Sequence, residues 1–211
     1  MVLDGSFARQ VMRGDVVAGA EVIPVTIATN AITVTAANII TGIIQRTTTG
    51  GGTDTIDSAA NLVAGFQGAY GPIENGTTFR CKWIQNAAFA ITVQATANTG
   101  VTVTSGTVNA SSVKEYLVTV VNGTPTQTFA CVTANGSAIL TGLSAAQTAL
   151  LSPGMIVTNA VANLQGQTII SVQPGTGVTM SGNANATNAA PGVAVTFSPQ
   201  VTLVGLGQGL L

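Results

Sequence analysis

The chain has 211 residues, enough for one large β domain or two small ones with a buried core. Charged residues make up only 6% of it, with six Lys or Arg against seven Asp or Glu, whereas a typical soluble domain holds about 25%. This composition lacks the basic stripe that nucleic-acid binding requires, and the absence of histidine excludes His-based catalytic dyads and triads.

Residues 1–21 form the most charge-dense segment, and they show little strand alternation. We expect an extended arm that becomes ordered against a partner and adds specificity there. The alternative is a tail without a role. The segment has no apolar core of a secretory signal, and no later apolar run reaches the 18 residues of a membrane helix. Its charged residues are Asp4, Arg9, Arg13, Asp15 and Glu21.

Strand-like sequence begins at Val22, where VIPVTIATNAITVTAA predicts two short strands with a turn at Asn30. Residues 39–46 predict a further strand, and the TTTGGG run at 47–52 predicts a flexible loop.

One helix is expected near residues 55–66. Ile56, Ala59, Ala60 and Val63 recur at helical spacing. Thr53, Asp54 or Thr55 can cap the first amides, and Gly65 and Gly68 can end the helix. Asp57 near the start suits the positive end of the helix dipole. Asp54 and Asp57 are therefore interpreted as residues of the helix start rather than as a catalytic carboxylate pair.

Residues 78–121 alternate apolar and polar side chains, as in FAITVQ and VTVT, with turn signals between the runs. The pattern predicts four consecutive antiparallel strands, the core of a sandwich or jelly roll. Within these strands we expect a solvated face with cross-strand pairing for four charged residues. They are Arg80, Lys82, Lys114 and Glu115.

After Thr124-Pro125, five turn signals divide the chain into short strands and predict a second, small all-β unit. The apolar, Gly-rich ending at 201–211 either finishes the sheet or packs against a neighbour. No charged residue follows Glu115. Hydroxyls and amides alone can keep such a half soluble, but uncharged strand edges favour packing in a crowded assembly.

Few other residues suggest chemistry. Cys81 and Cys131 lack metal-ligand spacing and are expected to be buried free thiols, with a disulfide between neighbouring strands as the alternative. Trp83 and Tyr116 are expected to pack in the core rather than to form a sugar platform. No enzyme activity, cofactor or metal is predicted. The Asn-x-Ser/Thr triplets of this Asn- and Thr-rich chain are attributed to chance.

Two stretches resemble phage sequences. Residues 53–122, with TFRCKWIQNAAFAITVQATANTGVTVTSG after the expected helix, resemble a pattern in virion structural proteins of tailed bacteriophages. Residues 135–187 are similar to a small β module of phage capsid-surface and tail proteins, with L-x-x-G-M-x-V, then G-x-T-I-x-S-V, then V-T-M-S-x-x-A. The residues that match this module are Gly154, Met155, Val157, Gly166, Thr168, Ile169, Ser171, Val172, Val178, Thr179, Met180, Ser181 and Ala184.

Together, pattern and resemblance predict an all-β chain, with an antiparallel sandwich or jelly-roll domain and one short helix at 1–127 and a small β module at 128–211. The resemblance implies a structural protein of the virion, specifically a capsid decoration (cement) protein that stabilises the shell. A tail, baseplate or fibre component and a carbohydrate-binding module that recognises host glycans are the alternatives.

The same resemblance implies the partners. These are the major capsid protein and, because many decoration proteins sit at local three-fold positions, two further copies in a homotrimer on the capsid surface. Neither nucleic acid, nor a membrane, nor a small-molecule substrate is expected as a partner. Four charged residues of the arm are expected to contact the capsid. They are Asp4, Arg9, Arg13 and Asp15.

Overall fold

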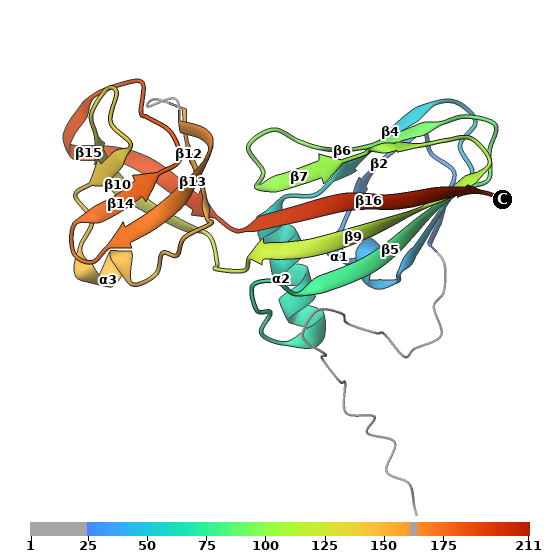
Figure 1. The fold of residues 1–211 in the computed structure, drawn as a ribbon, viewed down its shortest axis with the longest axis horizontal. Coiled ribbons are helices and arrows are strands. Elements are labelled where there is room, and N and C mark those ends of the chain that lie inside the picture. The colour runs from blue at the N-terminus through green and yellow to red at the C-terminus, as the bar shows by residue number, and fades with distance from the viewer. Residues whose placement is uncertain (1–24, 161–163) are drawn as a thin grey trace, which may run out of the picture.

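The structure is a computed structural model that describes residues 25–160 and 164–211 (Figure 1). Strands dominate the described residues, and they form two sheets and a closed barrel with three short helices. The prediction of an all-β chain is therefore confirmed.

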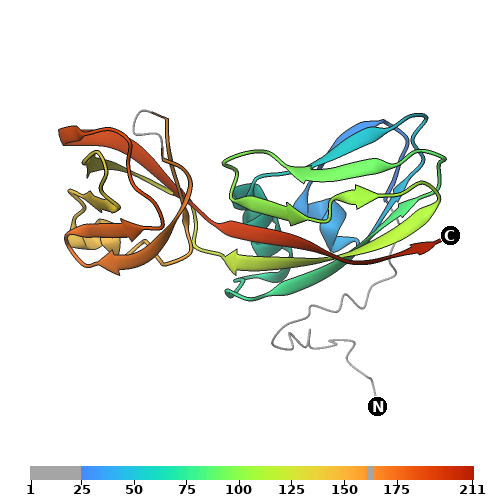
Figure 2. The same cartoon turned by 45° about the horizontal axis from the view of Figure 1, so that its top comes forward.

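Ten strands form a two-sheet unit around one apolar core. Figure 2 shows its two sheets as separate layers. In spatial order, the six-stranded sheet consists of β1 (Val25–Ile27), β3 (Ile43–Arg46), β5 (Thr78–Gln85), β9 (Ser112–Asn122), β16 (Gln200–Leu210) and β7 (Val101–Thr104). The four-stranded sheet consists of β2 (Ala31–Val34), β4 (Gly52–Ile56), β6 (Ile91–Ala95) and β8 (Thr107–Val108).

Consecutive strands from β1 to β9 alternate between these two sheets. As a result, β1, β3 and β5 are parallel neighbours in one sheet, and β2, β4 and β6 are parallel neighbours in the other. The prediction of four consecutive antiparallel strands over 78–121 is wrong in this respect, although β5 and β9 do pair antiparallel. Alternation identifies a strand with one buried face, but it does not say which sheet that strand joins.

The predicted helix exists as α2 (Ala59–Tyr70), but it begins later than expected. Ser58 is its N-cap, because the Ser58 side chain accepts a hydrogen bond from the Asn61 N–H at 3.2 Å. Residues 53–56 belong to β4, where Asp54 and Ile56 share the buried face. Gly65 and Gly68 lie inside the helix, which ends at Gly71 with φ of +83°.

Two shorter helices were not expected. These are α1 (Ala36–Ile40) and α3 (Ala145–Thr148). Each begins with a reciprocal capping box, formed by Thr35 with Asn38 and by Ser144 with Gln147. Because α1 includes Ile39 and Ile40, the strand expected over 39–46 is shortened to β3.

The second unit is a closed six-stranded barrel with its own apolar core, which includes Met155, Phe197 and Leu140. Around the barrel the strands are β10 (Gln127–Thr133), β11 (Ile139–Thr141), β14 (Gly177–Met180), β13 (Leu164–Gln173), β12 (Ile156–Asn159) and β15 (Asn188–Ser198). The predicted second β unit is thus present and closes into a barrel, but two of the five predicted turns, at Gln165-Gly166 and Pro191-Gly192, are wrong because these residues lie inside β13 and β15.

The barrel is inserted between two neighbouring strands of the first unit. After β15 the chain leaves the barrel and enters β16, which pairs with β9 along residues 200–210 and therefore belongs to the first unit (Figure 1). In the expected division, residues 128–211 formed one module. The strand pairing corrects its C-terminal limit, because residues 200–210 finish the six-stranded sheet, which was one of the two alternatives for the chain ending.

Candidate functional site

A buried ion pair joins the two sheets of the first unit. Arg46 on β3 lies with Nη2 2.9 Å from Oδ1 of Asp54 on β4, and both side chains are fully buried. Arg46 also donates to the carbonyls of Ile27 at 3.0 Å and Thr29 at 2.8 Å. Trp83 Nε1 donates to the other oxygen of Asp54 at 3.2 Å. The pair therefore fixes one layer against the other through the core.

Burial raises the pKa of the Asp54 carboxyl more than the Arg46 charge and the Trp83 hydrogen bond lower it. Burial, with the Asp54 charge as a smaller cause, also raises the pKa of the Tyr116 hydroxyl. Solvent does not reach these side chains, so the cluster is suited to holding sheets together rather than to acting on a substrate.

Lys114 and Tyr116 hold the tight turn between β7 and β8. Lys114 Nζ donates to the carbonyls of Ser105 and Thr107, the latter at 2.7 Å. The Tyr116 hydroxyl lies 3.1 Å from the carbonyls of both Ser105 and Gly106. Burial lowers the pKa of the Lys114 ammonium. Lys114 was expected on a solvated face, which is wrong, because on β9 it shares the inner face with Tyr116.

The other charged residues of this sheet are placed as predicted. Arg80 and Lys82 are exposed on β5, and Arg80 Nη1 lies 3.2 Å from Oε1 of Glu115 on β9. This is the expected cross-strand pairing on the outer face. At exposed positions such a pair contributes little to stability.

Trp83 and Tyr116 are fully buried, and their rings meet edge to face with centroids 4.8 Å apart. Their predicted core role is confirmed, and neither ring can serve as a sugar platform. Cys81 and Cys131 are free and buried, as predicted. Burial raises the pKa of the Cys131 thiol to about 12 and also raises that of Cys81, so both thiols stay protonated near neutral pH.

The two carboxylates near the helix start do not form a pair. Asp57 precedes the N-cap, and its Oδ1 accepts from the Ser58 N–H at 2.7 Å and from Asn61 Nδ2 at 2.8 Å. Asp54 instead lies in β4 and points into the core. The predicted capping role is thus wrong for Asp54, and Asp57 does support the start of α2.

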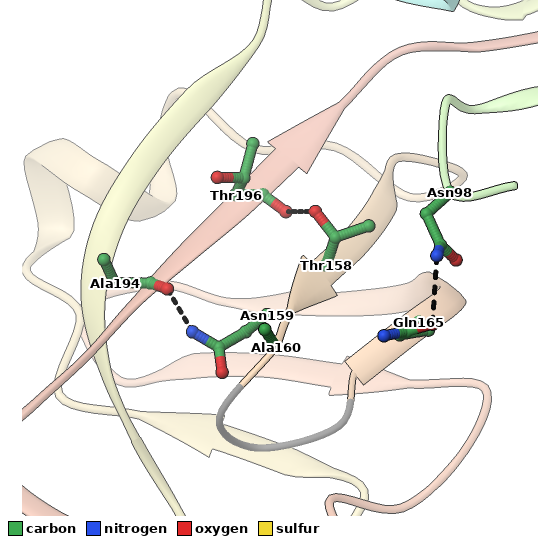
Figure 3. A pocket seen from close by; sticks show the side chains of 7 residues that line it. All are labelled: Asn98, Thr158, Asn159, Ala160, Gln165, Ala194 and Thr196. Atoms are coloured by element: carbon green, nitrogen blue, oxygen red, sulfur yellow. Dashed lines mark hydrogen bonds between the residues drawn. The ribbon is translucent and has the colours of Figure 1, made fainter. Parts of the chain in front are cut away.

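A pocket of about 360 Å³ lies where the barrel meets the first unit (Figure 3). Asn98, from the β6–β7 loop, donates through Nδ2 to Oε1 of Gln165 at 3.0 Å. The barrel supplies the remaining lining residues, which are Thr158, Asn159, Ala160, Gln165, Ala194 and Thr196. The lining holds amides, hydroxyls and methyl groups without charge, so it can hydrogen-bond a neutral polar group but supplies no acid or base.

The sequence analysis predicted neither the Arg46–Asp54 ion pair nor the pocket, for different reasons. Ile44 and Arg46 are two residues apart on β3, as are Asp54 and Ile56 on β4. Period-two spacing from a buried isoleucine was therefore a usable signal for both charges. The pocket offered no such signal, because Asn98 reads only as a turn residue and its neighbours are far away in sequence.

Asp4, Arg9, Arg13 and Asp15, the expected capsid contacts, lie outside the described residues. In the described ranges, no group of three or more His, Cys, Asp or Glu side chains could hold a metal ion. No helix among residues 25–160 and 164–211 is long and apolar enough to cross a membrane.

No family model matches the chain, and neither the curated proteins nor the solved structures compared with it gave a match.

Proposed function

We propose that this chain is a non-enzymatic structural protein of a tailed-bacteriophage virion, and specifically a decoration (cement) protein on the capsid exterior. The observation that carries the proposal is the charge-free second half of the chain, from Tyr116 to Leu211. The barrel within it exposes three large apolar side chains, with exposed fractions of 45% for Ile139, 50% for Leu150 and 59% for Ile170.

A surface of this kind suits a protein that spends its life in contact with other protein. Charges normally keep free subunits apart and protect sheet edges from pairing. On a virus shell, contacts with neighbouring subunits would cover the sheet edges and protect them from pairing. Binding only the assembled shell stabilises it by linkage, as a ligand does that binds only the native state.

For the two-sheet unit we propose a sandwich rather than a jelly roll. A jelly roll is built from antiparallel strands, whereas here β1, β3 and β5, like β2, β4 and β6, are parallel neighbours. Both sheets contribute residues to one core.

The proposed partners are the major capsid protein and two further copies in a homotrimer. Subunit contacts in the trimer would use apolar and hydroxyl side chains with few ion pairs, because the second half has no charges to offer. The charged arm of residues 1–21 would contact the shell, with Asp4, Arg9, Arg13 and Asp15 as the contacting side chains.

The test is binding to isolated shells. Capsids that lack this protein are mixed with the full chain or with a chain lacking residues 1–15, and bound protein is measured after pelleting. We expect saturable binding of the full chain, a higher thermal disruption temperature of the shell, and loss of binding for the truncated chain. Binding to isolated tails but not to shells would instead support the tail, baseplate or fibre alternative.

Glycan recognition is the second candidate, and the neutral pocket is the observation that favours it. Its amides and hydroxyls, from Asn98, Thr158 and Gln165 among others, match the hydroxyl groups of a neutral sugar. It lacks an aromatic platform, because Trp83 and Tyr116 are buried elsewhere. Glycan-array binding that is lost in Gln165→Ala, without shell binding by the full chain, would favour this candidate.

A further inference from the structure

The last strand of the chain has an open edge. β16 pairs with β9 over residues 200–210, but it pairs with β7 only over residues 201–204. Beyond Val204, the side of β16 that faces away from β9 has no strand neighbour among the described residues. Figures 1 and 2 show this end of β16 running out to the C-terminus along the margin of the sheet.

The backbone groups on that open side can be assigned from the pairing. Leu211 N donates to Ser111 O at 3.1 Å, so the N–H of Leu211 points toward the β9 side. Alternate residues of a strand point their N–H and C=O groups to opposite sides. Gln208 and Leu210 therefore present theirs to the open side. The register shift between Gly205 and Gly207 leaves Leu206 without a partner on β9, and regular pairing with β9 resumes from Gly207 to Leu210.

This edge carries few of the features that protect natural edges from pairing. Proline and charged side chains, especially lysine, are the usual protection, and residues 205–211 contain neither. Apart from Gln208, their exposed side chains are apolar, with exposed fractions of 49% for Leu206, 90% for Leu210 and 61% for Leu211. An added Cβ at Gly207 or Gly209 would meet no atom within 4 Å, so the face of the sheet is also uncovered at these two positions.

The sequence of the free stretch identifies the occupant. Residues 206–210 read Leu-Gly-Gln-Gly-Leu, which is the same in both directions about Gln208. When two copies of a palindromic strand pair antiparallel, each residue faces its own kind. Leucine then meets leucine, glycine meets glycine and the central amide meets its equivalent. No charge on this stretch opposes the approach of an identical strand.

We propose that two copies of this chain associate by antiparallel pairing of β16 with β16 across a two-fold axis at Gln208. The two six-stranded sheets become one continuous sheet, in which Leu206 faces the partner's Leu210. The Gln208 side chain donates from Nε2 to Ser112 Oγ on β9 at 2.7 Å, so the contact across the axis is made by the backbone of Gln208. This contact is two-fold, so it does not rest on the proposed virion role or on the proposed trimer.

A contact made by the five residues 206–210 of each copy buries far less than the roughly 1,600 Å² of a standard interface, so we expect weak association that depends on protein concentration. Disulfide trapping suits such a contact. Residues directly opposite in an antiparallel pair have Cβ atoms about 4.5–5.5 Å apart, so a movement of about 1 Å brings two cysteines to the roughly 3.5–4.5 Å that a disulfide requires. The native Cys81 and Cys131 are buried, so their background reaction should be low.

The experiment compares Gln208→Cys with Val204→Cys under mild oxidation. Val204 is also exposed on β16, at 40%, but it lies beside β7 and four residues from the proposed axis. We expect covalent dimers of Gln208→Cys at several times the yield of Val204→Cys. A mixture of Leu206→Cys and Leu210→Cys should also crosslink more than either variant alone. Equal yields for positions 204 and 208 would overturn the proposal.

A second measurement does not depend on cysteine chemistry. Leu210→Lys places a charge at the most exposed position of the edge, and sedimentation velocity compares it with the unmodified chain over a range of concentrations. We expect the concentration-dependent dimer of the unmodified chain to be lost in the variant, while circular dichroism stays unchanged. A chain that remains monomeric at the highest concentration, or a variant that dimerises equally well, would contradict the two-fold contact.

Discussion

At the residue scale, the ion pair between Arg46 and Asp54 connects the two sheets. Each is fully buried, and each would be an uncompensated buried charge without the other. Removing one partner of such a pair typically destabilises a protein by about 3–5 kcal/mol, whereas replacing both by apolar residues of similar volume is often neutral or stabilising. The pair is therefore expected to add little net stability compared with two apolar residues that fill the same space.

We therefore expect Arg46→Met to lower the free energy of unfolding by about 3–5 kcal/mol, and Asp54→Leu to have a comparable effect. The double variant should lie closer to the unmodified chain than either single variant does. Urea denaturation followed by Trp83 fluorescence measures all four proteins. If the double variant lost the sum of the two single losses, the pair would not be coupled across the core.

The same pair predicts a pH dependence. The pKa of Asp54 is raised in the folded state, so the folded chain binds this proton more tightly than the unfolded chain does. Its contribution to stability is present below the unfolded pKa of about 3.9 and is lost as the pH rises through the folded pKa. Relative to the double variant, the unmodified chain should gain stability as the pH falls from 7 toward 4. Urea midpoints at the two pH values test the sign, and a relative loss at pH 4 would refute it.

At the scale of single elements, substitutions can test which residue is the N-cap of α2. Ser58 rather than Thr53 or Thr55 supplies the capping oxygen. Ser58→Ala should lower the free energy of unfolding by about 1 kcal/mol, because the Asn61 N–H loses its acceptor, whereas Ser58→Asp should keep most of it. Thermal unfolding of Thr55→Ala is the matched control. A larger loss at Thr55 than at Ser58 would favour the earlier helix start that the sequence suggested.

Some strands and helices could be predicted from the sequence, but their pairing could not. The alternation along 78–121 identifies β5 and β9 because each strand has one face in the core. Their neighbours were not predictable, since strand pairing depends on where the chain returns, and the β1–β9 segment alternates between two sheets. Thr35 with Asn38 and Ser144 with Gln147 carried a capping signal, but the helices behind them are too short for a periodic pattern.

Of the candidate sites, the ion pair had a signal in the sequence and the pocket had none. Arg46 and Asp54 were within reach of period-two reasoning, because each lies two residues from a buried isoleucine. The pocket was not, because it forms only where the β6–β7 loop meets the barrel. The return of β16 to the first sheet depends on pairing with β9, about 80–100 residues earlier, which no local pattern reports.

At the scale of the whole molecule, the barrel is an insertion with its own core. Asn122 at the end of β9 is the register partner of Gln200 at the start of β16, so the insertion leaves and re-enters at adjacent points. Replacing residues 123–199 by a two-residue Asn-Gly turn would join β9 and β16 as a hairpin.

We expect this shortened chain to fold, because the core of the two-sheet unit contains no residue of the barrel. It should lose the Asn98–Gln165 and Asn122–Ser152 hydrogen bonds, and therefore a modest part of its stability. Circular dichroism and a cooperative thermal transition are the readouts. A shortened chain without cooperative unfolding would mean that the two units are stable only together.

The central proposal, that this chain decorates the outside of a phage capsid, is tested most directly by cryo-electron microscopy of the virions of the phage proposed to encode it. The account predicts ordered density for the two-sheet unit and the barrel on the outer capsid surface, in three copies around local three-fold positions, with residues 1–21 against the shell. Density for this chain in the tail, or its absence from the particle, would contradict the account.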